Sequence, residues 1–317
     1  MAKRRQRRSP PEPPGPSGFL VVDKPPGQTS HDIVDAARRW FGTRRVGHLG
    51  TLDPQATGVL PLAIRAATKL IPFIESDTKI YDGTVVLGAE TDTLDCEGEI
   101  LRRFEGELPD RARVEAALEE FIGDVEQVPP MYSAVKKDGV PLHRLARQGQ
   151  EVERASKWIV IDRIEMTRFE LPEVDLRVVC SAGTYVRVLA DDLGKELGCG
   201  AHLGGLRRTR SGPFTIAESH TLAELDAAAA AGKLEDWLID PVKALGFPLQ
   251  KVSGEQRVRL LNGGDLPAGE HHRLAPGSRI SLLDEGGALR AVAELRADRR
   301  LWPLRVLPPE PHEKPWG

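Results

Sequence analysis

The order of strand-like and helix-like segments is the feature that most restricts the fold of this chain. Segments with the composition of β-strands lie at 18–23, 82–88, 158–171 and 174–181. Segments with apolar residues at helical spacing lie at 31–42, 110–123 and 184–198. They do not alternate as the regular βαβ units that a doubly wound parallel sheet requires. The order therefore predicts an α+β fold built on a mixed sheet.

The length of 317 residues fits one large and one small domain better than a single small core. Residues 1–17 are basic and then proline-rich, so we expect a disordered arm. Short strands separated by glycines predict a small β-barrel-like domain at 248–310, with a tail at 311–317. The large domain would then span 18–247. Between about 124 and 154 the periodicity is lost, which is typical of a functional loop.

The first helical segment carries signals at both of its ends. Ile33, Val34 and Ala37 share one face, Ser30 is placed to cap the first turn, and Gly42 ends the helix. Since a strand and a short turn precede it, the sequence predicts a strand, a turn and a helix in immediate succession.

Composition and charge exclude some classes of protein. Hydrophobic residues make up 40% of the chain, and no apolar run approaches the roughly 20 residues that span a bilayer. The basic N-terminus has no apolar segment behind it, so we expect a cytoplasmic protein. Cys96, Cys180 and Cys199 are far apart, as in proteins with reduced thiols and no metal site. The net charge is −3, but the basic clusters at 38–45 and 206–210 suit either a polyanion or a solvated face.

The stretch GHLGTLDPQATGVL at 47–60 gathers turn-forming residues around one carboxylate, Asp53. Pro54 biases Asp53 towards an extended conformation, and the glycines allow the backbone to pass close to a bulky group. A carboxylate on such a loop suits a nucleophile or a general base that faces a pocket. An Asp-Pro turn or a helix cap is the structural alternative. The residues alone leave both interpretations open.

Several stretches, in order along the chain, resemble motifs of the TruB family, the tRNA pseudouridine-55 synthases. GHLGTLDPQATGVLPL is similar to the family's catalytic motif, and GFLVVDKPPGQTSHDIV is similar to its first motif. KIYDGTVVLGAETDTLDCEGEI resembles the segment with the active-site tyrosine, and PPMYSAVKKDGVPLHRLARQGQEVER resembles the RNA-gripping thumb loop. CSAGTYVRVLADDLGKELGCGAHLGGLRRTRSGPF resembles the arginine motif. The C-terminal part resembles a PUA-type RNA-binding domain, whereas the N-terminal arm is outside the family pattern.

The resemblance implies an enzyme that isomerises uridine to pseudouridine at position 55 in the T-arm loop of tRNA, without cofactor, metal or guide RNA. Asp53 would be the nucleophile, and three routes are open: attack at C6 of the base, attack at C1′ of the ribose, or assistance of a glycal route. Arg187 would pair with Asp53 and keep it ionised. Tyr81 would stack on the target base and assist the proton step at C5. Without the resemblance, Arg187 fits a surface cation on a helix and Tyr81 fits ordinary sheet packing.

The resemblance also implies a set of contacts with an RNA whose target base is flipped out. His48 would fill the space that the base leaves, and Asp95 would contact the RNA loop, with turn roles as the alternatives. Lys24 is placed among the substrate-binding residues, although it would support the catalytic loop more than it touches substrate. Tyr185 and Leu206 would line the pocket. The cations that would contact phosphates are Lys136, Lys137, Arg144, Arg147, Arg207, Arg208 and Arg210.

Two other functions are compatible with these motifs. A guide-RNA-dependent (dyskerin-like) synthase subunit shares the catalytic residues, but the thumb-like loop favours the stand-alone type, since guide-dependent relatives lack that loop. A tRNA-folding chaperone would keep the binding surface, yet Asp53, Tyr81 and Arg187 are all present. We therefore expect a monomeric enzyme that binds tRNA and needs no obligate protein partner or membrane.

Overall fold

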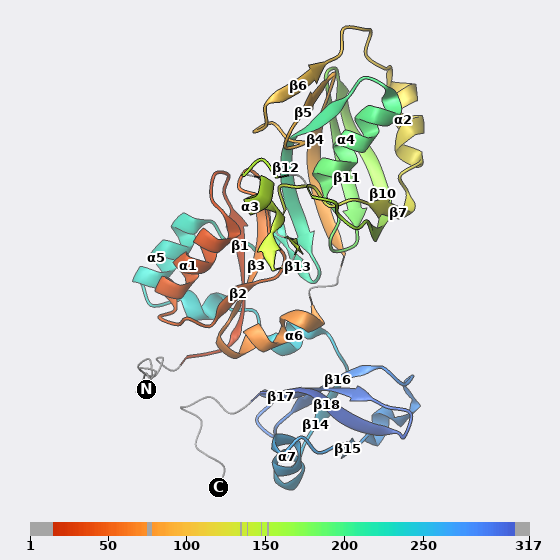
Figure 1. The fold of residues 1–317 in the computed structure, drawn as a ribbon. Coiled ribbons are helices and arrows are strands. Elements are labelled where there is room, and N and C mark those ends of the chain that lie inside the picture. Colours follow the sequence, from red (N-terminus) through yellow and green to blue (C-terminus); the bar gives the residue numbers. More distant parts are fainter. Residues whose placement is uncertain are drawn as a thin grey trace, which may run out of the picture.

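The computed structural model describes residues 15–74, 78–133, 135–137, 139–146, 148–150 and 152–307 (Figure 1). Most of the predicted arm at 1–17, the tail at 311–317 and Arg147 therefore lie outside the described residues. For Lys136 and Lys137 the structure describes the backbone and not the side chain. The expectations for these parts stay predictions.

A mixed sheet forms the larger part of the molecule and has nine strands within the described residues. They are β1 (Gly18–Lys24), β2 (Val46–His48), β3 (Thr57–Ile64), β4 (Lys79–Leu87), β7 (Gly123–Gln127), β10 (Lys157–Glu170), β11 (Glu173–Cys180), β12 (Ala201–Ser211) and β13 (Phe214–Thr215). The main path runs β1-β3-β12-β4-β11-β10-β7, with β2 on β3 and β13 on β12. Among these nine strands, β3 and β12 pair in parallel, and all the other pairs are antiparallel. The predicted α+β class with a mixed sheet is confirmed.

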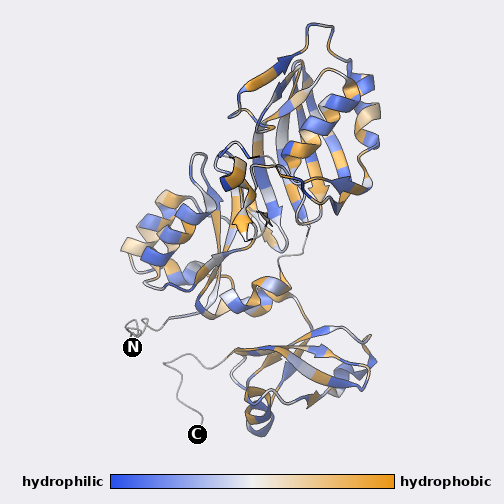
Figure 2. Ribbon diagram, in the orientation of Figure 1, coloured by the Kyte–Doolittle hydropathy of each residue, from blue (hydrophilic) through white to orange (hydrophobic). Residues whose placement is uncertain are grey.

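Two helices, α2 (Arg111–Glu119) and α4 (Val186–Leu197), cover one face of this sheet (Figure 1). Side chains on β4 alternate between buried and partly exposed positions, because successive strand residues point to opposite faces. Figure 2 shows the resulting mixture of hydrophobic and hydrophilic positions along the strands. Tyr81 and Val85 lie on the buried face and join the core with Leu189 of α4. This packing brings the first turn of α4 to the same pocket as Tyr81.

At the β1 end of the sheet, α1 (Ser30–Trp40) lies beside α5 (Leu222–Ala230) (Figure 1). The predicted cap of α1 is wrong by one residue. Thr29 has the extended conformation of a cap, accepts a hydrogen bond from the backbone N–H of Asp32, and forms a capping box with it. Ser30 is therefore the first helical residue, and its hydroxyl group does not cap the helix.

The segment resembling a thumb loop begins later than expected, because β7 stays in the large sheet up to Gln127. The described part of the loop contains the short strands β8 (Lys136–Lys137) and β9 (Val140–Pro141) and the helix α3 (Leu142–Ala146). After β4, the strands β5 (Ala89–Thr91) and β6 (Ile100–Arg103) pair antiparallel in a two-stranded sheet of their own.

The C-terminal region forms a curled sheet of its own, in the order β14-β16-β17-β18-β15. These strands are β14 (Leu249–Lys251), β15 (Leu266–Pro267), β16 (Arg279–Leu283), β17 (Leu289–Leu295) and β18 (Arg300–Val306), with α7 (Gly254–Leu261) beside them. The sheet is consistent with the predicted PUA-like fold. The connecting elements are α6 (Pro241–Leu245) and the 3-10 helices η1 (Arg65–Phe73), η2 (Ile216–Glu218), η3 (Leu234–Trp237) and η4 (Gly269–Arg273). An apolar cluster joins the two regions, with Phe19 and Val59 on one side and Val292 and Leu307 on the other.

Candidate active site

Asp53 lies on the loop between β2 and β3, at the wall of a pocket of about 280 Å³. Side chains reach this pocket from the loop between β2 and β3 (49–56, called the catalytic loop), from β4, from β12 and from the start of α4. It brings together six residues that the sequence analysis singled out: Asp53, Tyr81, Tyr185, Arg187, Leu206 and Arg208. They come from parts of the chain far apart in sequence, which the fold places around one space.

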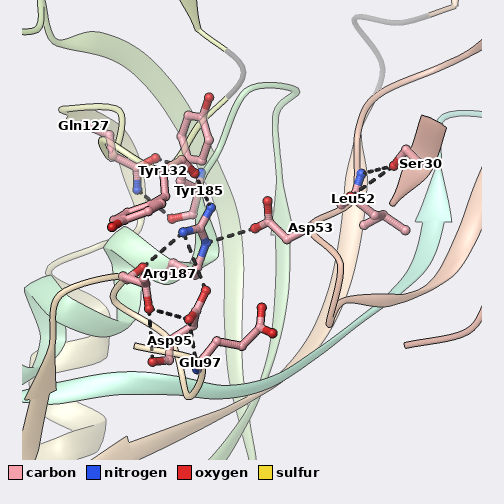
Figure 3. Close-up of polar contacts among 10 residues, drawn as sticks. Ser30, Leu52, Asp53, Asp95, Glu97, Gln127, Tyr132, Tyr185 and Arg187 are labelled. Carbon is pink, nitrogen blue, oxygen red and sulfur yellow. Dashed lines mark hydrogen bonds and ion pairs between the residues drawn. The ribbon is translucent and has the colours of Figure 1, made fainter. Parts of the chain in front are cut away.

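The Arg187 side chain is the centre of the polar contacts in this pocket (Figure 3). Its Nε lies 2.9 Å from Oδ2 of Asp53. Nη1 donates to the carbonyl oxygen of Thr93 at 3.0 Å, and Nη2 donates to that of Tyr132 at 2.9 Å. Arg187 is 4% exposed, whereas the Asp53 side chain is 43% exposed towards the pocket. The guanidinium is therefore held on three sides and fixes the orientation of the carboxylate.

Two opposing effects act on the charge of Asp53. Desolvation in the pocket raises the pKa of this carboxyl group above its ordinary value, and the nearby charge of Asp95 adds to that shift. The Arg187 guanidinium lowers the pKa but does not cancel the desolvation. The expectation that Arg187 keeps Asp53 ionised captures only one of these effects. A carboxylate with a raised pKa is more basic, which suits a nucleophile.

Asp95 has the turn role that the sequence left open. Its Oδ1 accepts hydrogen bonds from the Thr93 hydroxyl at 2.6 Å and from the Glu97 backbone N–H at 3.1 Å. Its Oδ2 lies 3.6 Å from Nη1 of Arg187. Asp95 thus shapes the turn whose Thr93 carbonyl holds the arginine, and its contact with RNA stays a prediction.

Lys24 supports the catalytic loop from below and is not a substrate-binding residue. It is 0% exposed, and its Nζ donates to the carbonyl oxygens of Pro25 at 2.9 Å, Pro54 at 2.8 Å and Ala56 at 2.7 Å. Burial lowers the pKa of Lys24 to about 8, and the charge of Asp53 opposes this shift. The three hydrogen bonds of the ammonium group thus join the turn after β1, at Pro25, to the two carbonyl groups that follow Asp53, at Pro54 and Ala56.

Arg208 is buried beneath the catalytic loop, and the prediction that it binds a phosphate is wrong. It is 1% exposed, and it donates to the carbonyl oxygens of Val59 at 2.8 Å and Gly50 at 3.1 Å. At Gly58, where φ is +96°, a Cβ atom would lie 2.2 Å from the Arg208 carbonyl oxygen. Burial raises the pKa of Tyr81, and the positive charge of Arg208 opposes that shift. Arg208 therefore ties the catalytic loop to β12 and borders Tyr81.

The other cations that were predicted to contact phosphates differ in whether their side chains already bind a partner within the protein. Arg207 pairs with both carboxylate oxygens of Asp23, at 3.1 and 2.8 Å. Arg210 is exposed, and its Nε donates to the Gly212 carbonyl oxygen. Arg144 is exposed on α3. Among the described side chains, Arg144 and Arg210 remain the better candidates for phosphate contacts.

The remaining predicted residues border the site from three elements. His48 is half-buried at the end of β2, on the strand that leads into the catalytic loop. Leu206 is a half-buried residue of β12 and gives the pocket an apolar wall. Tyr185 precedes the first turn of α4, and burial raises the pKa of its hydroxyl group. Their contacts with substrate stay predictions.

Two buried polar residues, Ser30 and Gln127, have roles in the site that were not predicted from the sequence. The Ser30 hydroxyl donates to the Leu52 carbonyl oxygen at 3.0 Å and accepts from the Leu52 backbone N–H at 2.9 Å. It thereby binds both backbone groups of the residue before Asp53 (Figure 3). A serine near a helix start is an ordinary cap signal, so its sequence context pointed elsewhere. Gln127 lies in a stretch without periodicity, and no signal marked it.

Replacing Ser30 with alanine should lower kcat about 10-fold, because Asp53 would lose the hydroxyl that fixes the preceding peptide group. The free energy of unfolding should also fall by about 1–3 kcal/mol, since two buried backbone groups would lose their partner. Steady-state kinetics and thermal denaturation measure both effects. Thr29→Ala is the matched control, because it removes the cap of α1 at a similar cost without touching the loop. An equal loss of stability in both variants with unchanged kcat in Ser30→Ala would show that Ser30 only packs.

None of the helices in the described ranges is long and apolar enough to cross a membrane. Two family models match consecutive parts of the chain. The model of the TruB family pseudouridylate synthase N-terminal domain matches residues 38–186, and that of the tRNA pseudouridylate synthase B C-terminal domain matches residues 187–245.

Curated relatives and a solved structure agree with these matches. A tRNA pseudouridine synthase B from Geobacter sulfurreducens is 44% identical over 85% of this chain and 90% of its own length. Its counterpart from Pseudomonas fluorescens is 40% identical over 92% of this chain and 95% of its own length. A chain from the crystal structure of a Cbf5-Nop10-Gar1 complex has a TM-score of 0.70 and 26% identity, covering 92% of this chain and 84% of that chain.

Proposed function

The chain belongs to the TruB family and is a tRNA pseudouridine synthase, an isomerase. On this premise we propose that it acts on uridine 55 in the T-arm loop of tRNA, with Asp53 as its nucleophile. The observation that carries the proposal is the 2.9 Å pair between Asp53 and Arg187 in a pocket bordered by Tyr81. A half-exposed carboxylate with a fixed orientation is placed to meet a base that enters this pocket.

The reaction exchanges one bond of the ribose for another. The bond from C1′ to N1 of uracil breaks, the base rotates, and a bond from C1′ to C5 forms. C5 loses its proton, and N1 gains one. In the proposed mechanism, Asp53 adds to the substrate in the first step and leaves in the last, which a carboxylate can do. Attack at C6 of the base and attack at C1′ of the ribose are both compatible with its position.

Tyr81 is proposed to stack on the uracil that enters the pocket. Its ring is 8% exposed and lies on the pocket wall formed by β4. Burial raises the pKa of the phenol, which keeps it protonated and suits a stacking surface. The adjacent Arg208 guanidinium opposes that shift. A part for Tyr81 in removing the C5 proton stays a prediction.

Base flipping is part of the proposal, because the reacting atoms of a stacked uridine cannot reach Asp53 inside a folded loop. Extraction costs a few kcal/mol of stacking and pairing energy. His48, on the strand before the catalytic loop, is proposed to occupy the space that the base leaves. Its flat imidazole can stack on neighbouring bases, which offsets part of the cost.

The decisive experiment measures tritium release from a tRNA transcript carrying 5-tritiated uridine, with purified protein and without guide RNA or added metal. The matched control is the same transcript with cytidine at position 55. We expect release of one tritium per transcript from the first RNA and none from the control. Equal release from both would place the target elsewhere. Tight binding of the first RNA without release would favour a guide-dependent subunit or a chaperone.

A further inference from the structure

The structure assigns a positioning role to Gln127, a buried amide that none of the catalytic assignments uses. We propose that Gln127 fixes the start of α4 and thereby holds Arg187 in register with Asp53. The inference deepens the proposed function and rests on it, because it concerns the same pocket. It makes Gln127 a positioning residue, since its contacts are with the backbone that carries Tyr185 and Arg187.

The first observation is the pair of hydrogen bonds between Gln127 and one backbone unit. Gln127 ends β7 and is 3% exposed. Its Oε1 accepts from the Tyr185 N–H at 2.8 Å, and its Nε2 donates to the Tyr185 carbonyl oxygen at 3.1 Å (Figure 3). A primary amide can donate and accept in one plane, so it satisfies both groups at once.

The second observation is that the start of α4 has no cap from its own sequence. Tyr185 occupies the cap position in an extended conformation, and its side chain makes no capping hydrogen bond. A helix start leaves backbone groups without partners, and these are usually satisfied by a capping side chain. Gln127 supplies from β7 a partner for one of these groups, the N–H of Tyr185. The amide therefore ties the first residue of the helix start to the sheet.

The third observation is a further hydrogen bond between the segment 127–132 and α4. Arg187 lies two residues after Tyr185, and its Nη2 donates to the Tyr132 carbonyl oxygen at 2.9 Å. The segment 127–132 thus holds α4 at two points, through the Tyr185 backbone and through the Arg187 side chain. A displacement of about 1 Å at a catalytic group can cost 100-fold in rate, so a two-point hold on Arg187 has a direct effect on Asp53.

The surroundings of the amide decide how a substitution would behave. Lys157 lies opposite Gln127 in the β7–β10 ladder, and Arg154 donates to the Pro129 carbonyl oxygen. Among the described residues, Asp95 lies 3.6 Å from Arg187, and the pocket at this end of α4 is lined by these titratable or charged groups: Asp53, Lys79, Tyr81, Tyr185, Arg187 and Arg208.

The test is Gln127→Glu, which keeps the shape of the side chain. An ionised carboxylate can accept from the Tyr185 N–H, but its second oxygen would face the Tyr185 carbonyl oxygen and repel it. A protonated carboxyl group can donate to that carbonyl and restore both bonds. Burial would raise the pKa of the new group, so the protonated form is accessible at mildly acidic pH. We expect kcat of the variant to fall by about 10- to 100-fold at pH 8.

The ratio of variant to wild-type kcat at each pH is the decisive readout, because it removes the titration of Asp53 common to both proteins. We expect this ratio to rise towards one as the pH falls, with the dissociation constant for tRNA changed less than about threefold. Glu126→Gln is the matched control, an acid–amide exchange at an exposed neighbouring position, and its ratio should stay near one at all pH values.

Each remaining outcome is decisive. A ratio near one for Gln127→Glu throughout the pH range would overturn the positioning role. A loss that does not change with pH would also overturn it, because it would indicate a general packing defect. Absence of tritium release by the wild-type protein would instead contradict the proposed function itself, so the two failures are distinguishable.

Discussion

Asp53→Asn is expected to reduce tritium release by at least about 10,000-fold, the order of loss that follows removal of a covalent nucleophile. An amide has the shape of the carboxylate and can still accept a hydrogen bond from Arg187, but it cannot add to the substrate. Affinity for a nucleic acid depends largely on phosphate contacts, and Asp53 is one small acidic side chain, so tRNA affinity should change less than about threefold. Single-turnover release assays and filter binding measure the two quantities.

Asp82→Asn is the matched control for this substitution. Asp82 follows Tyr81 on β4, is exposed on the opposite face of the strand, and pairs with Arg177 at 2.7 Å. An exposed ion pair contributes about 0–1 kcal/mol, so this variant should retain activity close to wild type. If Asp53→Asn kept more than about one hundredth of the wild-type rate, the nucleophile would have to be another group.

Arg187→Lys is the second substitution with a large expected effect, at least a 100-fold loss in kcat. A lysine keeps the positive charge, but its ammonium group cannot reproduce the planar contacts with Asp53, Thr93 and Tyr132. The carboxylate would then sample several orientations, and misplacement on the scale of 1 Å costs about that factor. Saturating single-turnover kinetics separate this loss in kcat from a change in binding.

The pH profile of a second variant, Arg187→Met, separates charge from geometry. Arg187 lowers the pKa of Asp53, so loss of its positive charge raises that pKa further. In the proposed mechanism the active form is the ionised carboxylate, and its protonation would then begin at a higher pH. The acid limb of the kcat profile should therefore move to higher pH in Arg187→Met and stay close to wild type in Arg187→Lys. A wild-type acid limb in both variants would mean that Asp53 does not control this limb.

The structure shows why some residues of the site were predictable from sequence and others were not. Asp53 stands out because glycines and Pro54 surround it, and these signals act within a few residues along the chain. Ser30 and Thr29 are adjacent and both suit a cap, yet one caps α1 and the other holds Leu52. That choice depends on where the catalytic loop lies against the helix, which local propensity does not contain.

Arg207 and Arg208 show the same limit on one strand. The sequence presents them as one basic cluster, and both were predicted to grip phosphates. Successive strand residues point to opposite faces, so β12 turns one arginine into the loop region and leaves the other beside Asp23. Which arginine is buried depends on the pairing of β12 with β3 and β4.

The sequence by itself determined the α+β class, the family and the carboxylate around which the site is built, because these depend on local composition and on motifs along the chain. The tertiary structure decided which cations hold the loop, which carboxylate shapes a turn, and how Gln127 reaches the start of α4. Those roles depend on burial and on hydrogen bonds between distant residues: Lys24 and Pro54 are 30 positions apart, Gln127 and Tyr185 are 58 apart, and Arg208 and Val59 are 149 apart. A charged or polar side chain has the same local signature whether it meets solvent, RNA or a backbone carbonyl, and only its folded surroundings distinguish these partners.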